Sequence, residues 1–171
     1  MPFAFIHLIG AWLIGLIFEK FSRKLNRLEW ALLLFGGILP DIDYLLQWTL
    51  NIDVHRVVTH SLLFGILVAS LVMIITALLR KKYTILNPRN CAIAIFAGIC
   101  MHLILDMVYR GGVPLFWPYE IWISYFGISY DQVIIQETYE MYKSLFKGAV
   151  LDMGIGVCWL GWLYFRKKIE F

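Results

Sequence analysis

The stretch Gly36-Gly37-Ile38-Leu39-Pro40-Asp41-Ile42-Asp43 decides how this chain folds, together with the segment His55-Arg56-Val57-Val58-Thr59-His60-Ser61 that follows it. Apolar sequence surrounds both segments, yet they carry two carboxylates, two histidines and an arginine. A later segment, His102-Leu103-Ile104-Leu105-Asp106, brings the same residue types. Because ionisable groups buried separately in an apolar interior are costly, the sequence predicts that these three segments meet.

The composition indicates an integral membrane protein. Of the 171 residues, 61% are hydrophobic and 16% are charged, whereas soluble domains carry about 25% charged residues. The length predicts one domain over residues 1–171. The three cysteines lie in apolar runs without a CxxC spacing, which excludes a disulfide scaffold.

Five apolar stretches reach or approach the roughly 20 residues that a membrane-spanning helix needs. The predicted fold is therefore an all-α, polytopic membrane helix bundle of about five spans. In the second stretch, Gly36-Gly37 and Pro40 are expected to bend or open the helix, since proline removes a backbone donor. The predicted spans are residues 3–18, 28–50, 57–79, 91–109 and 145–165.

Lysine and arginine predict the orientation of these spans. The segments 19–27, 80–90 and 166–171 hold 11 of the 15 basic residues. Cytoplasmic connections carry the excess of basic residues in membrane proteins. We therefore expect these segments inside, which places the N-terminus outside and the C-terminus inside.

One long connection, residues 111–144, is then predicted to lie outside. It starts with turn residues and aromatics suited to the lipid headgroup region. Apolar residues at helical spacing from Ile134 to Leu145 indicate an amphipathic helix on the outer interface. An outward extension of the fifth span is the alternative reading of the same pattern.

On this topology every histidine falls at a similar depth, on the outer side. The assignment of sides used only lysine and arginine, so this agreement is an independent check. Imidazole and carboxylate donors together suit Zn²⁺, with Mn²⁺ or Fe²⁺ as alternatives, and the set is large enough for one or two ions. The candidate metal ligands are His7, Asp41, Asp43, His60, His102 and Asp106.

Spacing within this set adds detail. His102 and Asp106 are four residues apart and share one helix face. Asp41 and Asp43 would point apart on a regular helix, so both can bind an ion only if the chain is unwound near Pro40. Asp43 has the alternative role of orienting a ligand.

Other groups also have structural alternatives. His7 could be a hydrogen-bond partner between helices instead of a ligand. Asp152, in the outer half of the fifth span, is more simply a cap or a partner of Arg110 or Lys147.

Two residues of the connection before the third span are candidates for catalysis. His55 is the candidate proton-transfer group. Arg56 could clamp an anionic oxygen through its planar fork, or simply balance the local carboxylates. The clamp makes a phosphate ester the leading substrate class, and a lipid headgroup is the natural substrate at this depth.

The order and spacing of these motifs resemble the YdjM-like, LexA-regulated family of membrane-bound metal-dependent hydrolases. The resemblance covers about residues 1–118 and implies a multi-pass protein of the prokaryotic inner membrane with a metal-dependent hydrolase activity. The expected partners are membrane lipids and a lipid or phosphate-ester substrate, with no nucleic acid. The matching residues are His7, Pro40–Asp43, His55–Ser61, His102–Asp106, Gly112 and Trp117-Pro118.

A non-catalytic metal-binding or ion-transport protein is the second function that fits. The sequence has no HExxH motif of an intramembrane zinc protease. An ion path needs polar residues on both sides of the membrane barrier. A cluster confined to the outer half therefore favours hydrolysis by a metal-activated water over transport.

Overall fold

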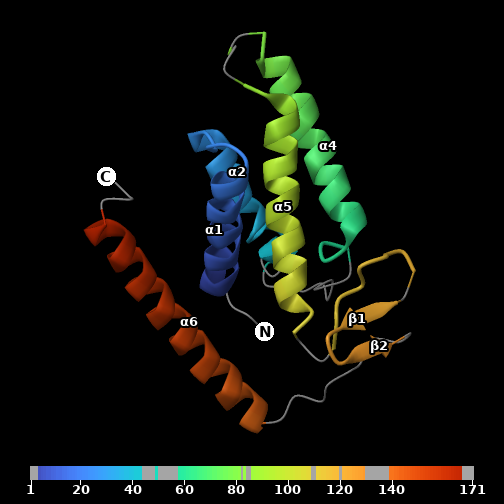
Figure 1. Ribbon diagram of the computed structural model, residues 1–171. Helices are drawn as coiled ribbons and strands as arrows, with labels where there is room; N and C mark the ends of the chain where they lie inside the picture. Colours follow the sequence, from blue (N-terminus) through green and yellow to red (C-terminus); the bar gives the residue numbers. More distant parts are fainter. Residues whose placement is uncertain are drawn as a thin grey trace.

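The computed structural model describes residues 4–43, 49, 58–81, 83, 86–108, 111–119, 121–129 and 139–166. It is mostly helical, which confirms the predicted all-α membrane fold (Figure 1). Four of its helices contain an apolar stretch long enough to cross a membrane. They are α1 (Ala4–Phe21), α4 (Leu62–Leu79), α5 (Pro88–Asp106) and α6 (Tyr139–Phe165).

The second predicted span is described over residues 28–43 and at 49, and over 28–43 it is not one continuous helix. Helix α2 (Arg27–Gly36) begins at an Asn26 cap and ends after ten residues. A turn and the 3-10 helix η1 (Leu39–Ile42) follow, with Pro40 in the first turn of η1. The predicted opening of the helix near Pro40 is thus confirmed: Asp41 lies in η1, and Asp43 is the residue that follows η1.

Helix α5 is the centre of the bundle and packs against α1, α2 and α4 (Figure 1). Its side chains Ile95, Ile99 and Leu103 are buried in the core. Helix α6 packs against α1 and lies apart from α4.

The glycines of the opening stretch let two backbones meet. A side chain at Gly36 would collide with the carbonyl oxygen of Ile95 on α5. A side chain at Gly98 on α5 would collide with the carbonyl oxygen of Leu33 on α2. Glycine therefore serves close approach of α2 and α5 here, in addition to the end of the helix that the sequence suggested.

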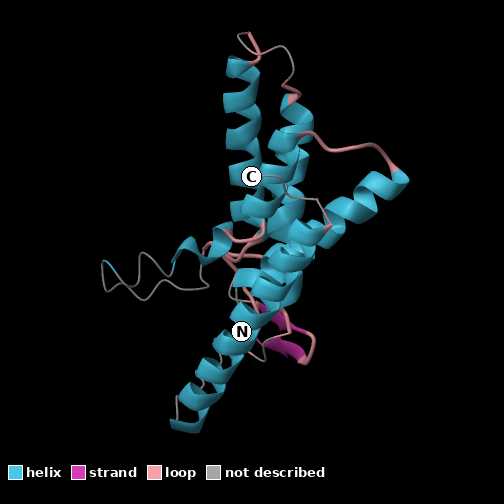
Figure 2. Cartoon of the chain, turned by 90° about the vertical axis from the view of Figure 1, so that its left-hand side faces the viewer, coloured by secondary structure: helices cyan, strands magenta, loops and turns pink. Residues whose placement is uncertain are grey.

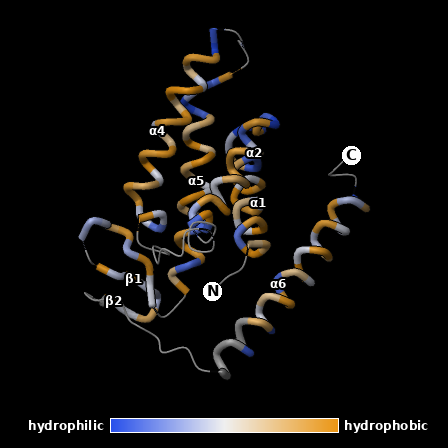
Figure 3. The backbone as a smooth tube through the Cα atoms, turned by 180° about the vertical axis from the view of Figure 1, so that it is seen from behind, coloured by the Kyte–Doolittle hydropathy of each residue, from blue (hydrophilic) through white to orange (hydrophobic). Residues whose placement is uncertain are grey.

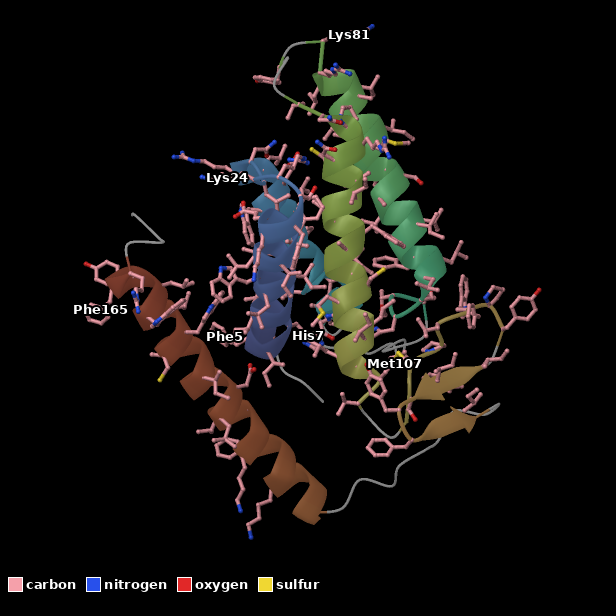
Figure 4. All side chains as sticks on the ribbon, in the orientation of Figure 1. Phe5, His7, Lys24, Lys81, Met107 and Phe165 are labelled. Atoms are coloured by element: carbon pink, nitrogen blue, oxygen red, sulfur yellow. The ribbon has the colours of Figure 1, made fainter. Side chains whose placement is uncertain are left out.

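The basic connections share one end of the bundle. Lys24 and Lys81 lie at that end, whereas His7 and Met107 lie towards the other (Figure 4). Helices α1, α4 and α6 run in one direction and α2 and α5 in the other, and hydrophobic residues predominate along the long helices (Figures 1 and 3). Which end faces the cytoplasm stays a prediction.

The long connection contains a β-hairpin that the sequence reading did not predict (Figure 2). Strands β1 (Trp122–Ser124) and β2 (Gly127–Ser129) pair antiparallel. Val113 bridges to Ile123, which brings the start of the connection against β1. Gly112 has φ +69°, and any side chain there would press on the backbone of Ile123, so glycine is required at this turn.

The start of α6 corrects the predicted interfacial helix. Helix α6 begins at Tyr139 and continues without a break to Phe165. From residue 139 onwards the amphipathic pattern therefore belongs to an extension of the last span, which was the alternative reading. Residues 130–138 lie outside the described part of the chain.

Candidate metal centre

Four side chains from three separate segments converge near the end of the bundle where α1 begins and α5 ends. Asp41 comes from η1, His60 from the turn before α4, and His102 and Asp106 from the last turns of α5. One donor atom from each lies within 4.8 Å of all the others, and the group could hold a metal ion. His60, His102 and Asp106 are buried, and the Asp41 side chain is 25% exposed.

The distances between the donor atoms suit a small divalent ion. His60 Nε2 lies 3.3 Å from His102 Nε2, 3.1 Å from Asp106 Oδ2 and 3.6 Å from Asp41 Oδ1. His102 Nε2 lies 3.6 Å from Asp41 Oδ1 and 3.9 Å from Asp106 Oδ2. A tetrahedral zinc with bonds near 2.0–2.1 Å holds its ligand atoms roughly 3.3 Å apart. The four donors thus fit such an ion with only small movements.

The backbone of the Gly-Gly stretch orients His102. Its Nδ1 lies 2.8 Å from the carbonyl oxygen of Gly37. A carbonyl oxygen only accepts, so Nδ1 carries the proton and Nε2 presents its lone pair to the other donors. The close contact of α2 and α5 at Gly36 and Gly98 brings this carbonyl within reach.

Thr59 and Asp43 orient His60 in the same way. The Thr59 hydroxyl donates to Asp43 Oδ2 over 2.7 Å and lies 3.0 Å from His60 Nδ1. Because the single hydroxyl proton is used on Asp43, His60 Nδ1 must itself be the donor and its Nε2 the acceptor. Asp43 Oδ2 also lies 3.5 Å from His60 Nδ1. Asp43 therefore occupies the position of the orienting group that the sequence offered as an alternative to a ligand.

The electrostatics of the cluster favour a cation at its centre. The lone pairs of His60 Nε2 and His102 Nε2 face each other in the company of two carboxylates. Carboxylate oxygens of Asp106, Asp41 and Asp43 lie 3.1, 3.6 and 3.5 Å from the ring nitrogens of His60. Positive charge, as a proton or a metal ion, is what stabilises this arrangement.

His7 joins the cluster from the side of α1 but is not one of the four converging donors. Its ring stacks on His102 with centroids 3.9 Å apart, and its Nε2 lies 3.4 Å from Asp106 Oδ1. It is 1% exposed. His7 thus contacts the carboxylate oxygen that faces away from His60, and its role as a ligand stays a prediction.

Asp152 caps the helix that carries His7. The backbone N–H groups of Phe5 and Ile6 donate to its two carboxylate oxygens, over 3.1 and 2.9 Å. A carboxylate at a helix N-terminus satisfies free amides and opposes the positive end of the helix dipole. Asp152 is thus a cap from α6 to α1, the structural reading that the sequence favoured, and Figure 4 shows Phe5 and His7 on the same end of α1.

Two candidate catalytic residues, His55 and Arg56, lie outside the described residues, so their roles stay predictions. Sequence reasoning also missed two groups, Thr59 and the Gly37 carbonyl. The sequence could have suggested Thr59 as an orienting group, since it lies beside His60 and its hydroxyl can donate to a carboxylate. A backbone carbonyl has no signal in the residue type, and only the packing of α2 on α5 reveals it.

Comparison with known proteins places the chain in a family. The family described as YdjM inner membrane protein matches residues 1–169. The match therefore includes the long connection and α6, beyond the 118 or so residues that carried the resemblance in the sequence motifs. No curated protein and no solved structure matches the chain.

Proposed function

This chain belongs to the YdjM family of inner membrane proteins, and we propose that it is a membrane-embedded metal-dependent hydrolase. It is a multi-pass protein of the inner membrane. The observation that carries the proposal is the convergence of two imidazole nitrogens and two carboxylate oxygens at one end of the helix bundle. These donors are His60 Nε2, His102 Nε2, Asp41 Oδ1 and Asp106 Oδ2.

The donor set favours Zn²⁺, since two imidazoles and two carboxylates are typical zinc ligands, and Mn²⁺ or Fe²⁺ are the alternatives. A bound divalent ion would supply a water that ionises near neutral pH and would polarise the bond to be cleaved. The orientation of both rings supports this use of the site. Gly37 holds His102, and Asp43 with Thr59 holds His60, so that both lone pairs are aimed before any ion arrives.

Asp41 is the most exposed of the four converging residues. Its side chain is 25% exposed, whereas the other three donors are buried. We infer that substrate and water reach the site from the side where Asp41 lies. A carboxylate there can accept the proton of the attacking water within hydrogen-bond reach. His7, against Asp106, holds that carboxylate towards His60.

The proposed substrate is a phosphate ester, with a lipid headgroup as the leading example. The cluster lies near one end of helices that are long and apolar enough to cross a membrane, and this position supports access for a headgroup. Arg56 is assigned the role of binding the anionic oxygen, because its planar fork pairs with phosphate through two parallel hydrogen bonds. His55 is assigned proton transfer to the leaving group.

A non-catalytic metal-binding protein is the second candidate, and one observation favours it. Four protein donors complete a tetrahedral site, whereas a catalytic zinc keeps a position for water. The exposure of Asp41 favours the enzyme, since a ligand at the open edge can yield to water. An ion-transport role is less favoured, because within the described residues the converging donors lie near one end of the bundle only.

Metal analysis of the purified full-length protein, followed by hydrolysis assays, tests the proposal. We expect about one or two divalent ions per chain. We also expect release of product from phospholipids or a chromogenic phosphate ester that stops on chelation and returns with added Zn²⁺. A metal-replete protein that hydrolyses none of these substrates would instead support the non-catalytic role.

A further inference from the structure

A hollow lies at the opposite end of the bundle from the metal centre. It has a volume of about 260 Å³ and lies between α1, α2 and α5. Most of its lining is apolar and includes Ile14, Phe18, Leu33 and Ala97. Its polar lining comes from Ser22, Arg23, Arg89 and Asn90.

The surroundings of this hollow carry a strong positive charge. In the described parts of residues 19–30 and 80–90 there are seven basic side chains and two carboxylates. Both carboxylates are engaged locally. Glu29 accepts two hydrogen bonds from Arg23, at 2.8 and 3.0 Å. Glu19 accepts from the backbone N–H of Leu25 and from the Trp30 ring.

Arg89 is the basic group at this hollow that remains available to a ligand. It lies in the first turn of α5, where Asn87 is the cap and Pro88 the first helical residue. Its side chain is exposed, and among the described residues no carboxylate pairs with it. The positive end of the α5 dipole adds to its charge. An anion beside Arg89 would therefore meet a guanidinium fork that no acidic side chain of the described residues occupies.

We propose that this hollow is a binding site for an anionic phospholipid, separate from the metal centre. One acyl chain would occupy the apolar part between Ile14, Leu33 and Ala97, and the phosphate would pair with Arg89. The argument is one of complementarity, because an apolar hollow that ends in unopposed positive charge matches an apolar chain that ends in a phosphate. Basic pockets between membrane helices bind anionic headgroups in this way.

Thermal unfolding of the purified full-length protein in detergent tests the proposal. The probes are dioleoylphosphatidylglycerol, dioleoylphosphatidylcholine, and glycerol phosphate without acyl chains. At tenfold the dissociation constant we expect the anionic lipid to raise Tm by about 3–6 °C. The zwitterionic lipid should give less than half of that rise, and glycerol phosphate should give none. An equal rise with glycerol phosphate would assign the site to a free phosphate and overturn the lipid proposal.

Two variants locate the site. Arg89→Gln should weaken the phosphatidylglycerol effect by about fivefold in concentration, the size expected for one basic residue near an anionic headgroup. Lys81→Gln is its control, since Lys81 is exposed at the same end but does not line the hollow. Retention of the full effect in Arg89→Gln would overturn the proposal.

Filling the hollow tests the acyl-chain part. Ala97→Phe should abolish the preference for phosphatidylglycerol with Arg89 intact. Ala92→Phe is the matched control on the same helix, because Ala92 lines a different apolar hollow between α4 and α5. An unchanged preference in a folded Ala97→Phe protein, or an equal loss in Ala92→Phe, would show that lipid binds elsewhere.

Discussion

The two ends of the bundle both bury a carboxylate, and they use it differently. Glu29 is 1% exposed at the basic end, and its oxygens accept hydrogen bonds from Arg23 and from the backbone of Asn26. Asp106 is also 1% exposed, but it faces His60 and His102 ring nitrogens whose lone pairs point inward. Burial of an acid therefore does not mark a functional site. A candidate functional site is marked instead by several nitrogen and oxygen acceptors whose lone pairs point at the same position.

This comparison explains why the two ends respond to different changes. At the basic end every oxygen of Glu29 has a donor, so the pair completes the cap of α2 and contributes to stability alone. At the other end, among the described residues, two imidazoles and two carboxylates gather around one point, an arrangement that could hold a cation. Substitutions at the first end are expected to change stability, and substitutions at the second to change metal binding.

The largest expected effect comes from removing two donors of the cluster. The double substitution His102→Ala with Asp106→Ala leaves one imidazole and one carboxylate, which is too few to hold an ion in competition with water. We expect metal affinity to fall by more than about 100-fold. Elemental analysis of the purified protein measures the result, and full metal content in the double variant would contradict the ligand assignment.

A smaller effect is expected when an orienting group is changed and the donors remain. Asp43→Asn removes the charge that holds Nδ1 of His60 as the donor. Metal affinity should fall by about 10- to 100-fold with the fold intact. Titration with a fluorescent zinc competitor would measure this, with circular dichroism as the control for folding. A loss as complete as in the double variant would show that Asp43 is itself a ligand.

The substitution Arg56→Lys, at the same end, distinguishes a metal-dependent hydrolase from a non-catalytic metal-binding protein. Arginine cannot bind a cation, so a pure metal site uses it for charge balance alone and lysine should replace it. A site that holds a phosphate needs the planar fork. We expect metal content to be kept and turnover to fall by about 10- to 100-fold, or about 1.4–2.8 kcal/mol of transition-state stabilisation. Unchanged turnover in a metal-replete variant would reject the clamp.

Glu29→Gln tests the basic end and should leave the metal centre unaffected. The substitution keeps the shape of the side chain but removes the charge that pairs with Arg23. We expect a loss of about 1 kcal/mol in the free energy of unfolding, because Arg23 is partly exposed and water replaces part of the pair. Chemical denaturation and elemental analysis would be run on one preparation. A loss of metal would mean that the two ends are coupled.

The smallest structural disturbance is expected from labelling the two ends. Single cysteines at Lys81 and Tyr119, both exposed, should react with a membrane-impermeant reagent from opposite sides of the membrane, Lys81 from the cytoplasm. The chain with only its native cysteines is the control. Reaction of both positions from the same side would contradict the predicted topology.

Several features of the fold and the site were predictable from the sequence, because the membrane imposes simple rules. Membrane spans are long apolar helices, since every backbone N–H and C=O group needs a hydrogen-bond partner within the chain where no water is present. The four converging donors are all among the six predicted candidates, since charged groups at one depth in an apolar chain need one another. The end of α2 before Pro40 was likewise readable, because proline and glycine act locally.

The β-hairpin and the extension of α6 back to Tyr139 were harder to predict from the sequence. The strands β1 and β2 are three residues each, and Val113, ten residues before Ile123, forms a bridge to it. Short strands have too few residues to show an alternating pattern. The amphipathic pattern before the last span fits an interfacial helix and an extension equally well, and only the continuous path of α6 separates the two.

By itself, the sequence determined that this is a helical membrane protein with histidines and carboxylates gathered at one depth. Only the tertiary structure decided which of those groups converge on one point and which orient a histidine ring. It aimed Asp41 at the centre and Asp43 at the far nitrogen of His60, and it turned the Gly37 carbonyl towards His102. The physical reason is that hydropathy depends on residue type, which the sequence contains. The direction in which a side chain or a carbonyl group points depends on how the backbone packs. Here it depends on the contact of α2 with α5 at Gly36 and Gly98.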